Sequence, residues 1–74
     1  LRDVDVRGLE PPQPMVAILE AVSSLSPGAE LKARTDRRPL HLYPQLIERG
    51  YSGQTEELSD GSFVTYIRPL RRTA

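Results

Sequence analysis

The chain has 74 residues and a formal net charge of zero, because ten lysines and arginines offset ten aspartates and glutamates. This length suits one small domain and leaves no room for a second core. The balanced charge removes the general electrostatic argument for binding nucleic acid or an anionic membrane. The absence of cysteine excludes disulfides, thiolate metal ligands and thiol nucleophiles.

Hydropathy gives an expectation about location. The longest apolar run, Met15 to Leu19, ends at Glu20 and is far shorter than the roughly 18 to 20 residues that span a membrane. No charged-then-apolar leader precedes the first predicted strand. We therefore expect a cytoplasmic protein with no membrane partner. Residues 1–70 are expected to form its single domain. A tail without periodicity begins near Pro69, and residues 71–74 are expected to fray.

Two predicted strands flank a predicted helix in the first half of the chain. Residues 3–7 and 30–35 alternate polar and apolar side chains, which is typical of half-buried strands. Between them a helix is predicted over residues 14–25, with proline in its first turn and Pro27 and Gly28 after its end. This strand–helix–strand order favours a parallel crossover. The side chains expected to be buried are Val4, Val6, Met15, Ile18, Leu19, Val22, Leu25, Leu31 and Ala33.

A second helix is predicted to end at Gly50. Pro44 lies inside the apolar pattern and would remove one hydrogen bond, so we expect a late start, with residues 39–43 forming a turn. Asp36 is a possible helix cap before that turn. The apolar stripe expected to face the core consists of Leu40, Tyr43, Leu46 and Ile47.

A hairpin is predicted to close the domain. Residues 51–58 are polar and should form an exposed or edge strand, and residues 59–62 supply a turn with Gly61. Residues 63–67 are the most β-prone run in the chain. The element order predicts an α+β two-layer βαβαββ sandwich: a four-stranded mixed sheet with two helices on one face. Leu19 and Ile67 are expected at the centre of the core, and the open sheet face is a place for a partner or a second copy.

Several strings of residues resemble a known family. Leu9-Glu10-Pro11-Pro12-Gln13-Pro14 follows a Val-Arg-Gly strand end and opens the first helix. Together with residues 26–28, Asp36, the Asp60-Gly61 turn and the element order, it resembles the TusA/SirA-like family of small sulfur-carrier proteins. The string over residues 39–44, Pro-Leu-His-Leu-Tyr-Pro, is similar to an uncharacterised TusA-related bacterial subgroup. The resemblance covers nearly all of the chain and implies a single TusA-like domain.

The resemblance also exposes a difference from the sulfur carriers. Their Cys-Pro-x-Pro motif holds a persulfide on cysteine at the start of the first helix, and here Pro11 stands at the cysteine position. Sulfur relay by the family mechanism is therefore contradicted by the sequence. What the resemblance still implies is the fold, and a partner surface at Glu10, Pro11, Pro12 and Gln13. The alternative is that the prolines only fix the turn between strand and helix.

A second candidate site is basic. Arg7 ends the first strand, and Arg37 and Arg38 precede the second helix, so guanidinium groups near two helix starts could hold a phosphate or carboxylate. The plainer interpretation is that exposed arginines pair with Asp36 and Glu30. A nucleic-acid surface is not expected, because the aromatic residues are few and do not interleave with the arginines.

Enzymatic and metal sites are weakly supported. His41 is the only histidine, and no second histidine or cysteine stands at ligand spacing. The acids at 3, 5, 56 and 57 are at positions typical of solvated strands, and no Gly-x-Ser-x-Gly turn occurs. We expect no cofactor and no metal. The preferred hypothesis is a non-enzymatic TusA-like interaction or carrier-derived module that contacts a protein partner; the alternatives are a small-anion or small-ligand binding domain and, more weakly, an enzyme or metal protein centred on His41.

Overall fold

The computed structural model describes residues 2–70, and the predicted tail at 71–74 lies outside them. Four strands and two helices follow in the predicted order. Their bounds are β1 (Arg2–Asp5), α1 (Gln13–Ser23), β2 (Leu31–Thr35), α2 (Leu42–Glu48), β3 (Tyr51–Glu57) and β4 (Phe63–Pro69).

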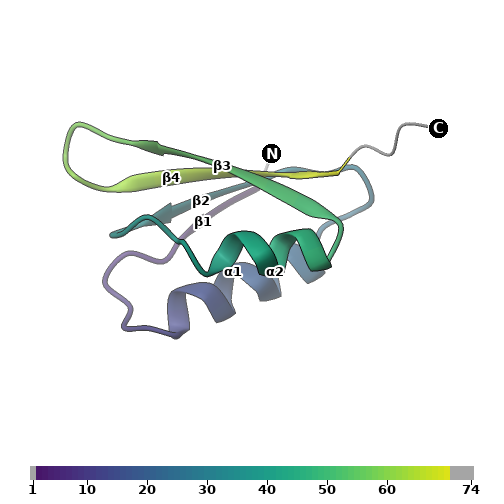
Figure 1. Ribbon diagram of the computed structural model, residues 1–74, viewed down its shortest axis with the longest axis horizontal. Coiled ribbons are helices and arrows are strands. Elements are labelled where there is room, and N and C mark those ends of the chain that lie inside the picture. The colour runs from purple at the N-terminus through teal and green to yellow at the C-terminus, as the bar shows by residue number, and fades with distance from the viewer. Residues whose placement is uncertain (1, 71–74) are drawn as a thin grey trace.

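The strands form one mixed sheet in the order β1-β2-β4-β3. β2 pairs parallel with β1 and antiparallel with β4, and β3 and β4 form an antiparallel hairpin. Both helices lie against the same face, and within residues 2–70 the other face carries no helix (Figure 1). The α+β two-layer sandwich predicted from the sequence is confirmed, including the parallel crossover through α1 and the place of β3 at a sheet edge.

The core fills the space between the sheet and the helices. The central strands β2 and β4 supply the inward side chains Leu31, Ala33 and Ile67, none of which is exposed. Ile67 is therefore a central core residue, as predicted. The remaining members of the buried apolar cluster are Val6, Ile18, Ala21, Val22, Leu42 and Leu46.

The rotation of α1 differs from the prediction for Leu19. Ile18, Ala21 and Val22 are the buried residues of the helix, at 1%, 9% and 3% exposure, whereas Leu19 is only partly buried and packs against the core. Residues 15–19 are all apolar, so their spacing alone does not decide which side of the helix faces the sheet. The prediction that Leu19 is central was wrong by one position.

The predicted stripe on α2 is also corrected. Leu42 and Leu46, one turn apart, are buried, whereas Leu40 and Ile47 are 65% and 55% exposed. Leu40 lies before the helix, which begins at Leu42, so helical spacing does not apply to it. Pro44 falls in the first turn, where a backbone N–H has no partner within the helix. The late start predicted from Pro44 is thus correct to within two residues.

β4 extends two residues beyond its predicted end, to Pro69. In the antiparallel pairing of β2 with β4, Leu31 stands opposite Ile67 and is the first residue of β2. The backbone nitrogen of Pro69 therefore faces a position beyond the start of β2, where no ladder hydrogen bond is lost. Leu70 continues along the hairpin and donates its N–H to the Gly50 carbonyl at 2.9 Å.

Gly53 lets α2 pack closely against β3. A Cβ built on Gly53 would lie 3.0 Å from Leu46 Cδ1, 3.2 Å from Thr65 Cγ2 and 3.5 Å from Tyr43 Cδ1. The Tyr43 hydroxyl also shares a hydrogen bond with the Thr55 hydroxyl, which in turn bonds the hydroxyl of Thr65 at 2.8 Å. This small polar chain ties α2 to both strands of the hairpin.

Candidate functional site

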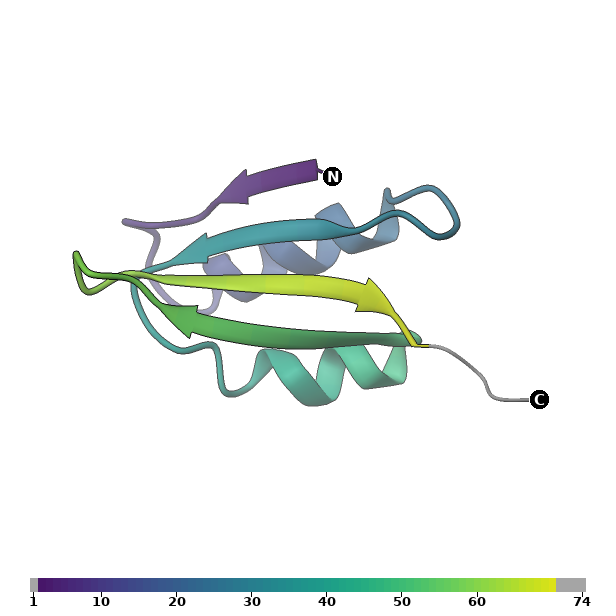
Figure 2. The ribbon, with the colours of Figure 1, turned by 90° about the horizontal axis from the view of Figure 1, so that it is seen from above.

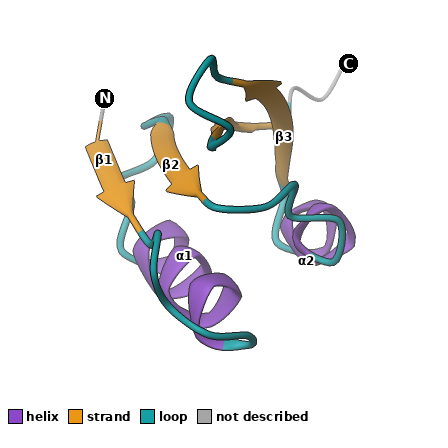
Figure 3. Ribbon diagram, turned by 90° about the vertical axis from the view of Figure 1, so that its left-hand side faces the viewer, coloured by secondary structure: helices purple, strands orange, loops and turns teal. Residues whose placement is uncertain are grey.

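Three connecting segments meet at the end of the molecule where both helices begin. The β1–α1 connection, the β2–α2 connection and the β3–β4 turn all lie at this end, on the left of Figure 1, and Figure 3 views it directly. The Gly8 N–H donates to the Asp36 carboxylate at 2.6 Å, which joins the first two segments. The β3–β4 turn follows the predicted pattern, with Gly61 at a positive φ of 85° and its N–H bonded to the Leu58 carbonyl.

The proline-rich connection, residues 9–13, is exposed throughout. Glu10, Pro11, Pro12 and Gln13, the predicted partner-binding residues, all lie on the surface in one continuous segment. The Gln13 N–H donates to the Glu10 carbonyl at 2.9 Å, so the segment turns tightly into α1. Pro12 is the N-cap, and no side chain caps the helix there. The Pro11–Pro12 peptide bond is cis.

Large apolar side chains accompany this connection. Leu9, Val16 and Leu40 are 43%, 46% and 65% exposed. Leu9 precedes the prolines, Val16 lies in the first turns of α1, and Leu40 lies in the β2–α2 connection at the same end of the molecule. Sequence reasoning did not include these three residues in the site, and it placed Leu40 in the core. Their exposure gives this end an apolar component that the polar side chains of Glu10 and Gln13 do not supply.

Arg7 forms a two-pronged ion pair with Asp5. The Arg7 Nε and Nη2 atoms lie 3.0 and 2.8 Å from the two carboxylate oxygens of Asp5. Hydrogen bonds from the side chain and backbone of Arg7 lower the pKa of Asp5 to about 2. The same Asp5 hydrogen bond, with weaker attraction to Asp60 and Asp36, raises the pKa of Arg7. Arg7 thus stands among carboxylates.

The other arginines at this end have separate neighbours. Arg38 lies over the Phe63 ring, 5.3 Å from its centroid. Arg37 is exposed, and its backbone carbonyl accepts a hydrogen bond from the Thr35 hydroxyl at 2.6 Å. The predicted anion-binding set, Arg7, Arg37 and Arg38, is therefore brought to one end of the molecule without shared contacts among its guanidinium groups.

Arg34, in β2, makes its contacts on the open sheet face and away from Arg37 and Arg38. Arg34 donates to the Ser62 hydroxyl at 2.9 Å and lies 3.6 Å from the Asp60 carboxylate. Hydrogen bonds from Ser62 are the main cause of a lowered pKa for Asp60. Val64, directly opposite Arg34 in the β2–β4 pairing, is only 2% exposed although it belongs to the face without helices. The contact between Arg34 and Ser62 depends on the register of β2 against β4, which the alternation of polar and apolar residues alone does not specify.

His41 is exposed and occupies the N-cap position of α2. Across residues 2–70, no three His, Asp or Glu side chains gather in a way that could hold a metal ion. None of the helices in that part of the chain is long and apolar enough to cross a membrane.

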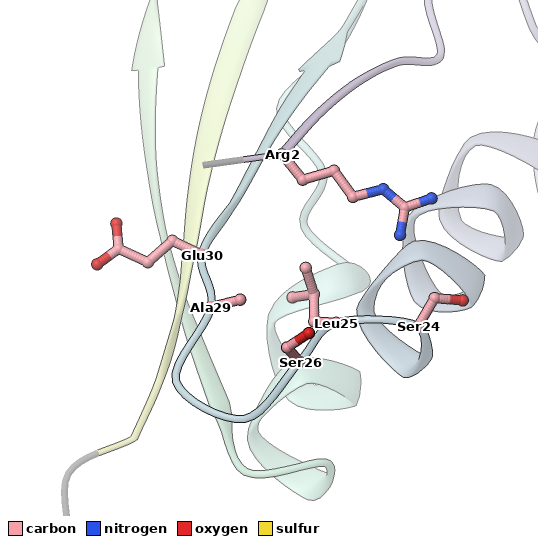
Figure 4. A pocket seen from close by; sticks show the side chains of 6 residues that line it. All are labelled: Arg2, Ser24, Leu25, Ser26, Ala29 and Glu30. Atoms are coloured by element: carbon pink, nitrogen blue, oxygen red, sulfur yellow. The ribbon is translucent and has the colours of Figure 1, made fainter.

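A shallow depression lies at the opposite end of the molecule, beyond the end of α1. It has a volume of about 390 Å³ and opens widely to solvent. Figure 4 shows its lining: Arg2, Ser24, Leu25, Ser26, Ala29 and Glu30. It contains none of the candidate binding residues proposed from the sequence, and its polar side chains are exposed.

The fold and family follow from comparison with known proteins. The structure of a SirA-like protein from Desulfitobacterium hafniense superposes with a TM-score of 0.83 at 19% sequence identity, covering 96% of this chain and 100% of that chain. The sandwich is thus a SirA-like fold. The family of uncharacterized conserved proteins DUF2249 matches residues 3–69, and the chain belongs to this family. No curated protein matches the chain.

Proposed function

We propose that this domain is a non-enzymatic protein-interaction module whose contact surface is the proline-rich connection and the exposed apolar residues at the same end of the molecule. The contact surface consists of Leu9, Glu10, Pro11, Pro12, Gln13, Val16 and Leu40. The observation that carries the proposal is that all seven are exposed at the same end of the fold. The chain's lack of cysteine leaves it without the group on which a TusA-like carrier holds sulfur.

Rigidity and composition support a protein partner. The ring of proline fixes one backbone angle, so a segment with adjacent prolines loses little conformational freedom when it binds. Leu9, Val16 and Leu40 offer apolar area to an interface, and Glu10 and Gln13 can provide polar contacts at its rim. The proposal includes the cellular location expected from the sequence, which is the bacterial cytoplasm.

The experiment is a comparison of captured proteins. Immobilised wild-type domain and the double variant Glu10→Lys/Gln13→Lys are incubated with extract from the source cell, and bound proteins are identified by mass spectrometry. Neither side chain belongs to the buried cluster, so the melting temperature should be unchanged while partner capture is lost. A control is Glu48→Lys, which reverses an exposed charge at the C-terminal end of α2.

Two results would remove this proposal. Identical proteins captured by the wild type and the double variant would leave the connection as architecture only. Loss of capture in Glu48→Lys as well would show that general charge, rather than this surface, retains the proteins.

The alternative of an anion site has a separate test. Arg7 is engaged by Asp5, and carboxylates surround it, so the contacts do not favour phosphate binding there. We expect inorganic phosphate or sulfate to leave the melting temperature unchanged, because only a ligand that binds the folded state raises it. A rise that disappears in Arg37→Ala/Arg38→Ala would establish the anion site instead.

A further inference from the structure

The free edge of β3 exposes a regular set of backbone groups. At the turn, the Leu58 N–H donates to the Ser62 carbonyl at 2.8 Å, and at the other end Leu70 donates to Gly50 at 2.9 Å. Backbone groups along an antiparallel strand point alternately toward and away from the partner strand. The even-numbered residues of β3 therefore face β4. The N–H and C=O groups that face outward belong to Tyr51, Gly53, Thr55 and Glu57.

This edge lacks several of the usual protections against strand pairing. β3 is seven residues long, contains neither lysine nor proline, and pairs with β4 without a bulge. The other edge of the sheet differs. β1 has four residues, and its outward-facing backbone belongs to Asp3 and Asp5, since Arg2 and Val6 donate toward β2. Two acids at the free edge of a short strand oppose pairing with another acidic strand.

α2 provides an apolar side to the β3 edge. Tyr43 lies against Gly53 and bonds Thr55, so this side of the helix follows β3. Ile47 is four residues later and thus on the same side one turn on, and it is 55% exposed. Viewed onto the open face of the sheet, α2 extends outward past β3 (Figure 2). A strand added to β3 would lie over this part of the helix.

The end of the edge is acidic. Glu56 and Glu57 are exposed, and neither forms an ion pair within residues 2–70. They lie at the C-terminal end of β3, and their side chains point to opposite faces of the sheet. An added strand with basic residues opposite both positions would complement the edge in charge.

We propose that the β3 edge binds an extended peptide segment as a fifth, antiparallel strand. The segment carries basic residues opposite Glu56 and Glu57, and an apolar side chain opposite Gly53 that packs on Ile47. A second copy fits less well, because a two-fold axis at this edge would bring together two α2 helices that each extend past their own β3 (Figure 2). This surface is separate from the proline-rich contact surface and does not depend on it.

The probe is an acetylated, amidated peptide of sequence Lys-Lys-Val-Thr-Ile-Thr-Val. In the proposed register its lysines lie opposite Glu57 and Glu56, and its isoleucine lies opposite Gly53. Protein NMR should show chemical-shift changes and slowed hydrogen exchange at the amides of Tyr51, Gly53, Thr55 and Glu57, at peptide concentrations up to about 1 mM. The amides of Ser52 and Gln54, already facing β4, serve as internal controls.

N-methylation of the peptide isolates the backbone hydrogen bonds. Methylating the isoleucine nitrogen removes an N–H that faces β3 and should abolish binding. Methylating the preceding threonine nitrogen, whose N–H faces solvent, should leave the affinity within about twofold, because no ladder hydrogen bond is lost. These two peptides are identical in composition.

Variants of the protein separate the apolar and charged parts. Ile47→Asp should weaken binding about tenfold, the order expected for truncating one central apolar contact, and should spare the fold because Ile47 is exposed. Ser23→Asp, which adds the same charge at an exposed position of α1, is the control. Glu56→Lys/Glu57→Lys should reject the lysine peptide and accept its Glu-Glu counterpart.

Three outcomes would overturn the proposal. The first is an absence of change at the four outward amides at the highest peptide concentration. The second is equal loss of binding from both N-methylated peptides. The third is protection of the same amides that rises with protein concentration and needs no peptide, which would assign this edge to a second copy of the chain.

Discussion

Replacing Gly53 with alanine tests the close packing of α2 on β3. The added Cβ would lie 3.0 Å from Leu46 Cδ1 and 3.2 Å from Thr65 Cγ2. Neither neighbour has any exposed surface, so neither can move into solvent to make room. Overpacking of this kind costs about 1–3 kcal/mol. The lower chain entropy of unfolded alanine offsets about 0.4–1 kcal/mol of that cost.

These two ranges leave a net loss of roughly 0–2.6 kcal/mol, and because both neighbours are fully buried we expect about 1–2 kcal/mol in the free energy of unfolding, measured by urea denaturation. For a domain of this size it corresponds to a drop of roughly 4–15 °C in melting temperature. Leu46→Ala removes the nearest obstructing atom, so Gly53→Ala should cost less in that background than in the wild type. A neutral or stabilising Gly53→Ala in the wild-type background would refute the packing argument.

Three further predictions concern the core, a carboxyl group and sulfur chemistry. Ile18→Ala should lower the free energy of unfolding by about 2–5 kcal/mol and Leu19→Ala by clearly less, as measured by urea denaturation; equal losses would contradict the observed rotation of α1. The pKa of Asp5, about 2 in the folded domain and 3.8 ordinarily, means that its ion pair stabilises the fold above about pH 4 and that this contribution is lost as pH falls toward 2. Carboxyl NMR titration should show that pKa returning toward its ordinary value in Arg7→Gln, and an unchanged pKa would exclude Arg7 as the cause. Incubation with a cysteine desulfurase and labelled sulfur should leave the chain unlabelled, because proline occupies position 11 and cysteine is absent; an added sulfur mass on the purified chain would disprove this.

The order and type of the elements could be predicted because local signals agree along the chain. Prolines and glycines mark the breaks, and the alternation in β2 assigns Leu31 and Ala33 to the core, as observed. The rotation of α1 could not be predicted, because an unbroken apolar run gives no preferred side. Leu40 was misplaced because the spacing was extended beyond the true start of α2 at Leu42.

The candidate site was predictable to a different extent in each part. Exposure of Glu10 and Gln13 follows from a proline-rich segment that cannot lie in the interior of a helix or of a sheet. The pairing of Asp5 with Arg7 had a local signal, since residues two apart on an extended segment point to the same side. Arg34 and Ser62 meet only through the register of β2 and β4, which depends on the packed structure.

The parallel pairing of β1 has a consequence for how the molecule folds and opens. β3 and β4 are neighbours along the chain and can pair early, whereas Arg2 reaches Leu31 only after the whole crossover through α1 has been closed. β1 adds just four residues to the sheet at an outer position, so fewer residue pairings hold it than hold any other strand. Opening of β1 alone would free the N-terminal anchor of the proline-rich connection while the hairpin and α2 stay folded. The shape of that connection is therefore coupled to the least stable strand of the domain.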